Sequence, residues 1–278
     1  MNSRLTLEIL FRTKLGYSLR LDTPHTYNEK LQWIKLYDRN PLMPRCCDKY
    51  AVRQYVESKG LGSILNGLIW QGFNPADIPF DDLPNKFALK VTHGSTFNII
   101  CSDKSEVDRD DAISKCRTWL KAKFLPCYGE WFYGVERPRV IVEDYLEGDE
   151  GSSLWDYRVF CFNGKPRLIS VYSDRNKSCR QDIYDTEWNY LDNLAGSYPK
   201  SGKPISKPEC LDQMLSAAAR LSEDFTHARV DFFIIKKRLV FGEITFTSGA
   251  GFSRFGTFEL DEMMGNWLEL PERSSLVA

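Results

Sequence analysis

One stretch near the C-terminus constrains the fold of this chain more than any other. Residues 228–247, ARVDFFIIKKRLVFGEITFT, contain two runs rich in β-branched and aromatic residues. The basic triplet Lys236–Arg238 separates the two runs. Two β-prone runs joined by a short connection predict a β-hairpin, here with a three-residue loop.

Alternation along the two strands predicts one apolar face and one polar face, because successive side chains of a strand point to opposite sides. The apolar face is expected to hold Val230, Phe232, Ile234, Val240, Ile244 and Phe246. A three-residue loop sets Asp231 directly opposite Glu243. It also sets Arg229 opposite Thr245, so these four side chains share the polar face.

Two carboxylates directly opposite each other, as predicted for Asp231 and Glu243, lie only about 5 Å apart and destabilise a hairpin. A divalent cation would offset the repulsion, since clustered carboxylate oxygens are its expected ligands. The alternative is a water-facing strand surface, on which a change of register by one residue separates the two acids. Under the metal interpretation, neutralising either acid leaves the fold intact.

Composition and charge exclude several classes of function. The chain has 278 residues, with 37 basic and 38 acidic side chains, so no bulk positive charge favours nucleic acid or an anionic membrane. No apolar run approaches the ~20 residues of a membrane-spanning helix, and residues 1–22 lack the apolar core of a signal peptide. These features predict a cytoplasmic protein, with peripheral association with membrane-linked machinery left open.

The eight cysteines are scattered and do not form a recognisable ligand pattern. No CxxC pair occurs, and only three histidines are present. Zinc sites need closely spaced Cys and His ligands, so neither a zinc site nor a disulfide framework is supported. The thiols are expected to be free and mostly buried.

The first 84 residues are predicted to be mainly helical. Tyr27–Asp38 has apolar residues among polar ones, as an amphipathic helix requires. Asp48 is placed to cap a second helix over Lys49–Lys59, which Gly60 ends. Loop-forming residues follow, and we place a domain boundary near Asn85.

A strand, a small-residue turn and a second strand open the following region. Phe87–Val91 and Asn98–Cys101 are the strands, and residues 92–96, THGST, form the turn. Backbone N–H groups of such a turn bind phosphate oxygens in many proteins, and Lys90 lies beside it. An ordinary hairpin with a glycine turn is the alternative, and the P-loop pattern is absent.

The segment Asp108-Arg109-Asp110 matches the short DxD pattern of metal-dependent glycosyltransferases. Its neighbours are polar and acidic, which is typical of a solvated helix start where acids favour the helix dipole. Both interpretations remain open from the sequence, and the second is favoured.

The middle of the chain alternates between strands and turns. A strand over Arg139–Val142 runs into an acidic and aromatic turn. The next strand, Asp156–Phe162, is followed by Asn163-Gly164, a strong hairpin signal, and by a return strand over Leu168–Tyr172. Residues 208–227 are predicted to form a helix with a core-facing apolar side.

Residues 173–188 are predicted to form a long polar loop that contains Arg175, Lys177 and Arg180. Loops of this length inside a compact domain are usually functional or disordered. One hypothesis is a mobile lid that folds over bound nucleotide and excludes water. The alternative is a solvated basic loop without a catalytic role.

Taken together, the order of these elements resembles the ATP-grasp superfamily, and the chain closely resembles its teichuronopeptide-biosynthesis (TupA-like) branch. The phrases that carry the resemblance are DKYAVR (48–53), FALKVTHGS (87–95), VEDYLEGD (142–149), DYRVFCFNGKP (156–166), IYDTEWNYLD (183–192), RVDFF (229–233) and FGEITFTSGAGF (241–252). The resemblance implies an α+β protein with the ATP-grasp fold. A mainly helical region, 1–84, would precede a core of two α+β subdomains, 85–150 and 151–278, that clasp ATP.

The resemblance also implies a nucleotide site. Lys90 would bind the phosphates of ATP, and the loop of Gly94 and Ser95 would close over them. Glu150 would bind the ribose hydroxyls. The residues implied to form the adenine-contacting hinge are Glu143, Asp144, Tyr145 and Leu146.

A catalytic and metal site is implied on the hairpin. Arg229 would contact the transferred phosphate, and Asp231 and Glu243 would hold Mg²⁺. Thr245 stands where the superfamily often has asparagine, and a neutral hydroxyl is a weaker Mg²⁺ ligand than an amide carbonyl. Arg158 would make a further phosphate contact.

The implied activity is ATP-dependent carboxylate–amine ligation through an acyl phosphate. The substrates would be small carboxylates and amines or saccharides, in cell-surface polysaccharide biosynthesis, with possible association with the machinery of that pathway. A glycosyltransferase with its metal at Asp108 and Asp110 is the rival enzyme class. A catalytically silent nucleotide-binding protein is the non-enzymatic alternative.

Overall fold

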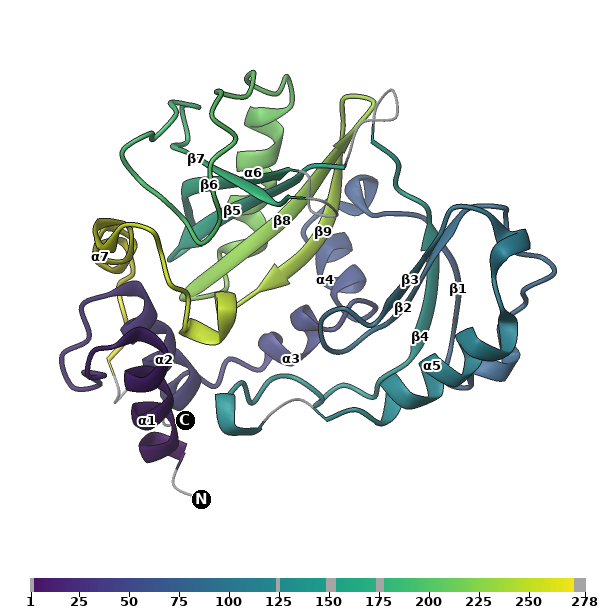
Figure 1. Cartoon of the computed structure of the whole chain (residues 1–278), viewed down its shortest axis with the longest axis horizontal. Helices are drawn as coiled ribbons and strands as arrows, with labels where there is room; N and C mark the ends of the chain where they lie inside the picture. The colour runs from purple at the N-terminus through teal and green to yellow at the C-terminus, as the bar shows by residue number, and fades with distance from the viewer. Residues whose placement is uncertain (1–2, 124–125, 149–153, 174–177, 273–278) are drawn as a thin grey trace. The chain divides into compact units, whose positions relative to one another are not determined.

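The structure is a computed structural model that describes residues 3–123, 126–148, 154–173 and 178–272. The chain forms two compact units, whose helices and strands are labelled in Figure 1. The first unit comprises Met1–Asn40, Leu125–Glu130 and Asp149–Ala278, and the second comprises Pro41–Phe124 and Trp131–Gly148.

The first unit is built on a five-stranded antiparallel sheet with the strand order β7-β6-β5-β8-β9. Its strands are β5 (Asp156–Phe162), β6 (Lys165–Ser173), β7 (Arg180–Tyr184), β8 (His227–Ile235) and β9 (Arg238–Thr245). Its α-helices are α1 (Ser3–Leu15), α2 (Tyr27–Tyr37), α6 (Leu211–Ser222) and α7 (Phe258–Trp267). Short 3₁₀ turns occur at η4 (Pro126–Tyr128) and η6 (Ser248–Gly251).

The second unit is built on a four-stranded antiparallel sheet with the order β1-β4-β2-β3. Its strands are β1 (Leu68–Gly72), β2 (Phe87–Val91), β3 (Asn98–Cys101) and β4 (Val140–Asp144). Its helices are α3 (Leu42–Cys47), α4 (Val52–Ser58) and α5 (Arg109–Lys121), with 3₁₀ turns η1 (Gly62–Ile64), η2 (Pro75–Asp77) and η3 (Lys104–Glu106). An apolar cluster of β2, β4 and α5 side chains forms its core.

The contacts divide the predicted helical region 1–84 between the two units. Residues 41–84 join the second unit because β1 pairs with β4, and that strand lies within a stretch predicted to be mainly helical. Residues 1–40 join the first unit, where α2 packs against α7 and η6. A strand of only five residues, such as Leu68–Gly72, carries little sequence signal.

Most of the predicted elements are confirmed. The strands 87–91, 98–101 and 156–162 have the predicted bounds, and α2 begins at Tyr27 as predicted. Asn163 and Gly164 both have positive φ, as expected for the tight turn between β5 and β6. The helix predicted over 208–227 is shorter, because His227 already belongs to β8.

The hairpin of β8 and β9 has the predicted pairing but a different tip. Ile235 pairs with Arg238, so the turn has only two residues, Lys236 and Lys237, with φ of 48° and 63°. A bulge at Gly242 then adds one residue to β9 and restores Asp231 opposite Glu243. A Cβ at Gly242 would lie 2.9 Å from the carbonyl oxygen of Asp231, so this position requires glycine.

The bulge also changes which residues face the core. Between the turn and the bulge, Phe232 pairs with Phe241, and Ile234 pairs with Leu239. Leu239 and Phe241 are therefore the buried residues of this part of β9. The prediction of Val240 on the core face is wrong, because it assumed an unbroken alternation along β9.

The prediction of a continuous loop over 173–188 is also wrong. Arg180–Tyr184 forms the edge strand β7, which pairs antiparallel with β6. A strand at this place removes the basis for a lid that includes Arg180. Arg175 and Lys177 lie outside the described residues.

None of the described helices combines the length and the apolarity needed to cross a bilayer.

Helix α2 is anchored to the five-stranded sheet by a buried histidine. The Nδ1 of His227 lies 2.8 Å from the carbonyl oxygen of Cys161, and its Nε2 lies 2.9 Å from the hydroxyl of Tyr27. A neutral ring, with Nδ1 as the donor and Nε2 accepting from Tyr27, satisfies both bonds. Burial lowers the pKa of His227 to about 3.

The lowered pKa of His227 predicts that the folded protein loses stability in mild acid. Its pKa is near 6.5 in the unfolded chain and lower in the folded one, so the unfolded state binds more protons below pH 6.5. The folded state loses about 2 kcal/mol from this group between pH 7.5 and pH 5. Urea unfolding of the wild type and of His227→Gln, each at pH 7.5 and at pH 5, measures this loss of stability. The stability gap between the two proteins should shrink by that amount at pH 5, and a constant gap would contradict the assignment.

Candidate functional site

Three neighbouring strands of the first unit each place two polar side chains on one face of the sheet. The pairs lie at positions i and i+2, so their side chains point the same way. They are Asp156 and Arg158 on β5, Arg229 and Asp231 on β8, and Glu243 and Thr245 on β9. The register aligns the strands, since Asp231 pairs with Arg158 on one side and with Glu243 on the other.

The guanidinium group of Arg229 is the centre of this face. It donates to both oxygens of Asp231, from Nε at 2.7 Å and from Nη2 at 2.6 Å. Nη2 also lies 3.3 Å from Oε1 of Glu243 and 3.0 Å from Oγ1 of Thr245. Burial disfavours the charge, but the attraction of Asp231 outweighs it and raises the pKa of Arg229 above its ordinary value.

Arg229 offsets the repulsion between the carboxylates of Asp231 and Glu243. From the sequence, a bound cation or exposure to solvent was expected to do so. The guanidinium bonds to Asp231 and to Glu243 at once, so the paired acids share one positive charge. Asp231 is almost completely buried, whereas the side chain of Glu243 is 47% exposed. Burial raises the pKa of Asp231 to about 6, although Arg229 opposes the shift.

Asp156 and Arg158 extend the charged face onto β5. The Nε and Nη2 atoms of Arg158 lie 2.9 and 2.8 Å from Oδ2 of Asp156, and Nε lies 3.6 Å from Oδ2 of Asp231. The guanidinium carbon also lies 3.9 Å from the ring centroid of Tyr172. Asp156 was not among the predicted site residues. The sequence did carry a signal for Asp156, because it alternates with Arg158 in the same way as Arg229 alternates with Asp231.

The charges and donor atoms of this face fit a divalent cation. The face has three carboxylates and two guanidinium groups, so acidic charge is in excess. Mg²⁺ is usually held by one or two carboxylates, with phosphate oxygens and water completing its shell. Within the described ranges, no group of three or more Asp, Glu, His or Cys side chains forms a complete metal site. Asp231 and Glu243 therefore fit Mg²⁺ that arrives with a phosphate ligand.

Thr245 takes part in the hydrogen bonds of the face. Its Oγ1 accepts from Arg229 and lies 3.4 Å from Oε1 of Glu243, to which it donates. The hydroxyl is thus placed to hold these two side chains in position. Its role as a metal ligand stays a prediction.

In the second unit, Lys90 is held by a carboxylate on the neighbouring strand. Nζ of Lys90 on β2 lies 2.7 Å from Oε2 of Glu143 on β4. The register explains this, because Ala88 pairs with Glu143 and Lys90 is two residues further along the same face. Arg53 of α4 lies 3.4 Å from the other oxygen of Glu143. Two cations therefore share one largely buried carboxylate.

Glu143 was predicted only as part of an adenine-contacting hinge, yet its side chain orients Lys90. The following Asp144 uses its backbone N–H and C=O to bind Gly67 and Asn66. Tyr145 and Leu146 are half-buried, and Nζ of Lys86 lies 5.6 Å from the Tyr145 ring centroid. Adenine contact by these residues stays a prediction.

A lysine before α4 holds the turn between β2 and β3. Nζ of Lys49 donates to the carbonyl oxygen of Gly94 at 2.7 Å, and its backbone N–H donates to Thr92 at 3.1 Å. Gly94 has a φ of 78°, which favours glycine, and Ser95 is exposed. Lys49 lies in the DKYAVR phrase, as does Arg53, but neither was predicted as a site residue.

Some predicted residues are placed elsewhere or not described. Asp108 caps α5 by accepting a hydrogen bond from the N–H of Asp111, and Asp110 lies in the first turn of that helix. This is the helix-start interpretation, so the structure gives no support to a metal site at these two acids. Glu150 lies outside the described residues.

Comparison with solved structures shows which proteins have a fold similar to that of this chain. An L-amino acid ligase from Bacillus licheniformis matches with 12% identity and a TM-score of 0.53, covering 99% of this chain and 62% of the other. An N5-carboxyaminoimidazole synthetase from Staphylococcus aureus in complex with ADP matches with 14% identity and a TM-score of 0.49, covering 90% of this chain and 61% of the other.

A D-alanine–D-alanine ligase from Bacillus anthracis in complex with ATP matches with 16% identity and a TM-score of 0.44, covering 72% of this chain. This chain spans only 55% of the length of that ligase. A search of curated proteins found no match.

A family model gives the assignment. The model described as TupA-like ATPgrasp matches residues 29–269, which include both the charged face of the first unit and the Lys90 pair of the second. The match covers most of the chain, and the fold agrees with it. The chain therefore belongs to the TupA-like ATP-grasp family.

Proposed function

We propose that this protein is an ATP-dependent carboxylate–amine ligase that acts through an acyl phosphate. The observation that carries the proposal is the charged face of β5, β8 and β9, with Arg229 buried among the carboxylates. Family membership supports it, and a solved structure of similar fold is named as an L-amino acid ligase. The first step would form a bond between a carboxylate oxygen and the γ-phosphorus of ATP, releasing ADP. An amine would then attack the acyl carbon and release phosphate.

The residues of this chain suit such chemistry because it depends on positioning and on charge neutralisation. Arg229 would contact the transferred phosphoryl group through the guanidinium nitrogens that now bind Asp231 and Glu243. Arg158 would add a second cation on the same face. When bound by Asp231 and Glu243, Mg²⁺ would supply charge neutralisation for the phosphate oxygens.

Lys90 would bind ATP phosphates from the second unit, oriented by Glu143 and Arg53. The turn of Gly94 and Ser95, held by Lys49, would offer backbone N–H groups to phosphate oxygens. Glu150 is proposed for the ribose on family resemblance alone. The cofactors of the proposed reaction are thus ATP and Mg²⁺.

The substrates we propose are a small carboxylate and an amine, one of them carried by a saccharide such as a uronic acid. Resemblance to the teichuronopeptide branch supports a place in cell-surface polysaccharide biosynthesis. Location in the cytoplasm and association with polysaccharide-synthesis machinery stay predictions. A screen of ADP release that pairs amino acids with uronic acids, free and polymeric, tests the activity. ATP binding without ADP release across the panel would favour a silent nucleotide-binding protein.

Glu243→Gln is predicted to abolish the Mg²⁺ dependence of ATP binding while leaving the fold stable. The Glu243 side chain is 47% exposed, so its neutralisation leaves no buried charge unpaired. Isothermal titration with a non-hydrolysable ATP analogue, with and without Mg²⁺, measures the effect. Glu187→Gln, an exposed acid of the same unit, is the matched control. Unchanged Mg²⁺-dependent affinity in Glu243→Gln would refute the metal assignment.

Asp231→Asn is predicted to destabilise the fold. This differs from the expectation from the sequence that either acid can be neutralised while the fold stays intact. Asp231 is buried and receives two hydrogen bonds from Arg229, so its loss leaves a buried guanidinium without its main partner. Removing one partner of a buried pair costs about 3–5 kcal/mol. Urea unfolding without ligand should show such a loss, and stability equal to that of the wild type would contradict the structural role of this pair.

Lys90→Met is predicted to weaken ATP binding at least about tenfold, the effect expected on losing a charge-assisted hydrogen bond to phosphate. The melting temperature without nucleotide should change little, because Arg53 remains beside Glu143. Titration calorimetry and thermal unfolding measure the two effects. Lys115→Met is the control, since Lys115 pairs with Asp111 on the exposed side of α5 in the same unit. A large loss of melting temperature with unchanged ATP affinity would show that Lys90 is only structural.

A further inference from the structure

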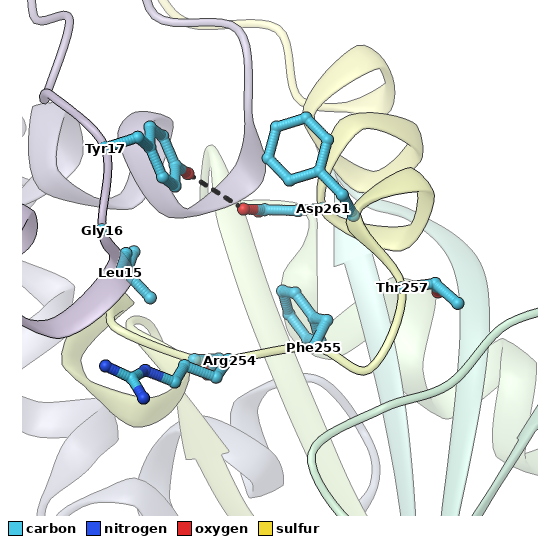
Figure 2. A pocket seen from close by; sticks show the side chains of 9 residues that line it. Leu15, Gly16, Tyr17, Arg254, Phe255, Thr257 and Asp261 are labelled. Carbon is cyan, nitrogen blue, oxygen red and sulfur yellow. Dashed lines mark hydrogen bonds between the residues drawn. The ribbon is translucent and has the colours of Figure 1, made fainter.

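The first unit contains a cavity of about 460 Å³ that the charged face does not include. Figure 2 shows it between the end of α1 and the segment that leads from η6 into α7. One side is lined by Leu15, Gly16 and Tyr17, and the other by Ser253, Arg254, Phe255, Thr257 and Phe258. In Figure 2 the ring of Phe255 stands near the middle of the lining, and the hydroxyl of Tyr17 points to Asp261.

The wall segment, residues 250–253, leads into one wall of this cavity and is held in place by three buried polar side chains of α2; of its residues, Ser253 lines the cavity. Asn28, Gln32 and Lys35 are spaced along one side of the helix and are at most 1% exposed. They donate to consecutive parts of the wall segment: Asn28 to the carbonyl oxygen of Ser253 at 3.0 Å, Gln32 to that of Gly251 at 2.6 Å, and Lys35 to that of Ala250 at 2.7 Å. The segment is therefore fixed without a ligand, which lowers the entropic cost of binding.

The lining combines aromatic surface with one cation. Tyr17, Phe255 and Phe258 supply the rings, and Phe258 is 53% exposed. Arg254 donates from Nε to the carbonyl oxygen of Lys14 and, among the described residues, makes no ion pair with a carboxylate. Its two terminal nitrogens are thus available to an anion, for which the planar guanidinium is well suited.

Asp261 also lines the cavity, but its oxygens are already bound. Oδ1 accepts from the backbone N–H of Asn28 at 2.9 Å. Oδ2 accepts from Nδ2 of Asn28 at 2.9 Å and from the hydroxyl of Tyr17 at 3.1 Å. These donors stabilise the carboxylate from within the protein, so Arg254 remains the charged group that a ligand would meet.

The cavity is connected to the charged face by a short series of contacts. Ser253 lines the cavity, and its hydroxyl donates to the carbonyl oxygen of Ser248 at 3.4 Å. The hydroxyl of Ser248 in turn accepts from Nη1 of Arg229 at 3.1 Å. The cavity and the guanidinium group of Arg229 therefore contact the same short segment of chain, residues 248–253.

We propose that this cavity binds a co-substrate of the ligase that carries an anionic anchoring group and a flat apolar body. The anion would bind the terminal nitrogens of Arg254, and the body would lie against Phe255 and Phe258. The role as co-substrate site rests on the ligase function proposed above. The proposal that the cavity binds such anions rests on the geometry of the cavity alone.

Matched small probes test the chemistry of the cavity. Phenylacetate and phenethylamine have the same ring, but one carries a carboxylate and the other an ammonium group. Ligand-observed NMR titrations of the full chain, saturated with a non-hydrolysable ATP analogue and Mg²⁺, should give a dissociation constant for phenylacetate at least about tenfold lower than for phenethylamine. Displacement of phenylacetate by the ATP analogue would overturn the proposal, because the probe would then occupy the nucleotide site.

Two variants and a control connect the binding to the named residues. Arg254→Met should weaken phenylacetate binding at least about tenfold, and Phe258→Ala should weaken both probes alike. Arg167→Met, which removes an exposed arginine on β6, should change neither. Equal binding of the two probes, or phenylacetate binding unchanged in Arg254→Met, would refute the anion site.

Titration of the ATP analogue against the same samples separates this proposal from the ligase function. Nucleotide binding with no phenylacetate binding would reject the cavity site and leave the ligase proposal in place. Phenylacetate binding without nucleotide binding would reject the co-substrate role, since no ligase function would remain for it to serve.

Discussion

The charged face of the first unit depends on one buried guanidinium group. Arg229 is 7% exposed, and its charge is retained only because Asp231, Glu243 and the hydroxyls of Thr245 and Ser248 surround it. A buried ion pair adds little net stability, since desolvation offsets much of the attraction. The effect of the pair here is mainly geometric, because the side chain of Arg229 fixes β8, β9 and the start of η6 relative to one another.

Under the function proposed above, this arrangement would couple the binding of a metal ion to the binding of a phosphate. In the structure Arg229 provides the positive charge between Asp231 and Glu243. A cation that took over these carboxylates would free guanidinium hydrogen bonds for a phosphate. Metal and phosphate binding would then be coupled through the same side chain, and each would favour the other, as linkage requires.

Sequence reasoning predicted the common face of the hairpin correctly, because the local periodicity was strong there. The alternation of Arg229, Asp231, Glu243 and Thr245 predicted their common face, and the structure agrees. The bridging role of Arg229 was missed, because alternation says which side chains share a face and nothing about which of them bond. The bulge was missed as well, although a glycine inside a strand, here Gly242, is a known sign of one.

Other features could not be predicted because their cause lies far away in the chain. Asn28, Gln32 and Lys35 are polar, so an amphipathic pattern assigns them to solvent. They are buried because they bind backbone carbonyls more than 200 residues later. The strand Arg180–Tyr184 is a separate case, since it lacks an apolar alternation and forms through pairing with the preceding strand, β6. Short elements of this kind are stabilised by tertiary contacts rather than by propensity.

The bulge at Gly242 has a consequence for how the hairpin can vary. Between the tip and the bulge, the strands pair in one register, and beyond it they pair in another. If all residues were kept and the strands paired without the bulge, Gly242 would stand opposite Asp231, and Glu243 would turn to the opposite face of the sheet. Gly242, a residue without a side chain, therefore decides which residue of β9 stands opposite Asp231.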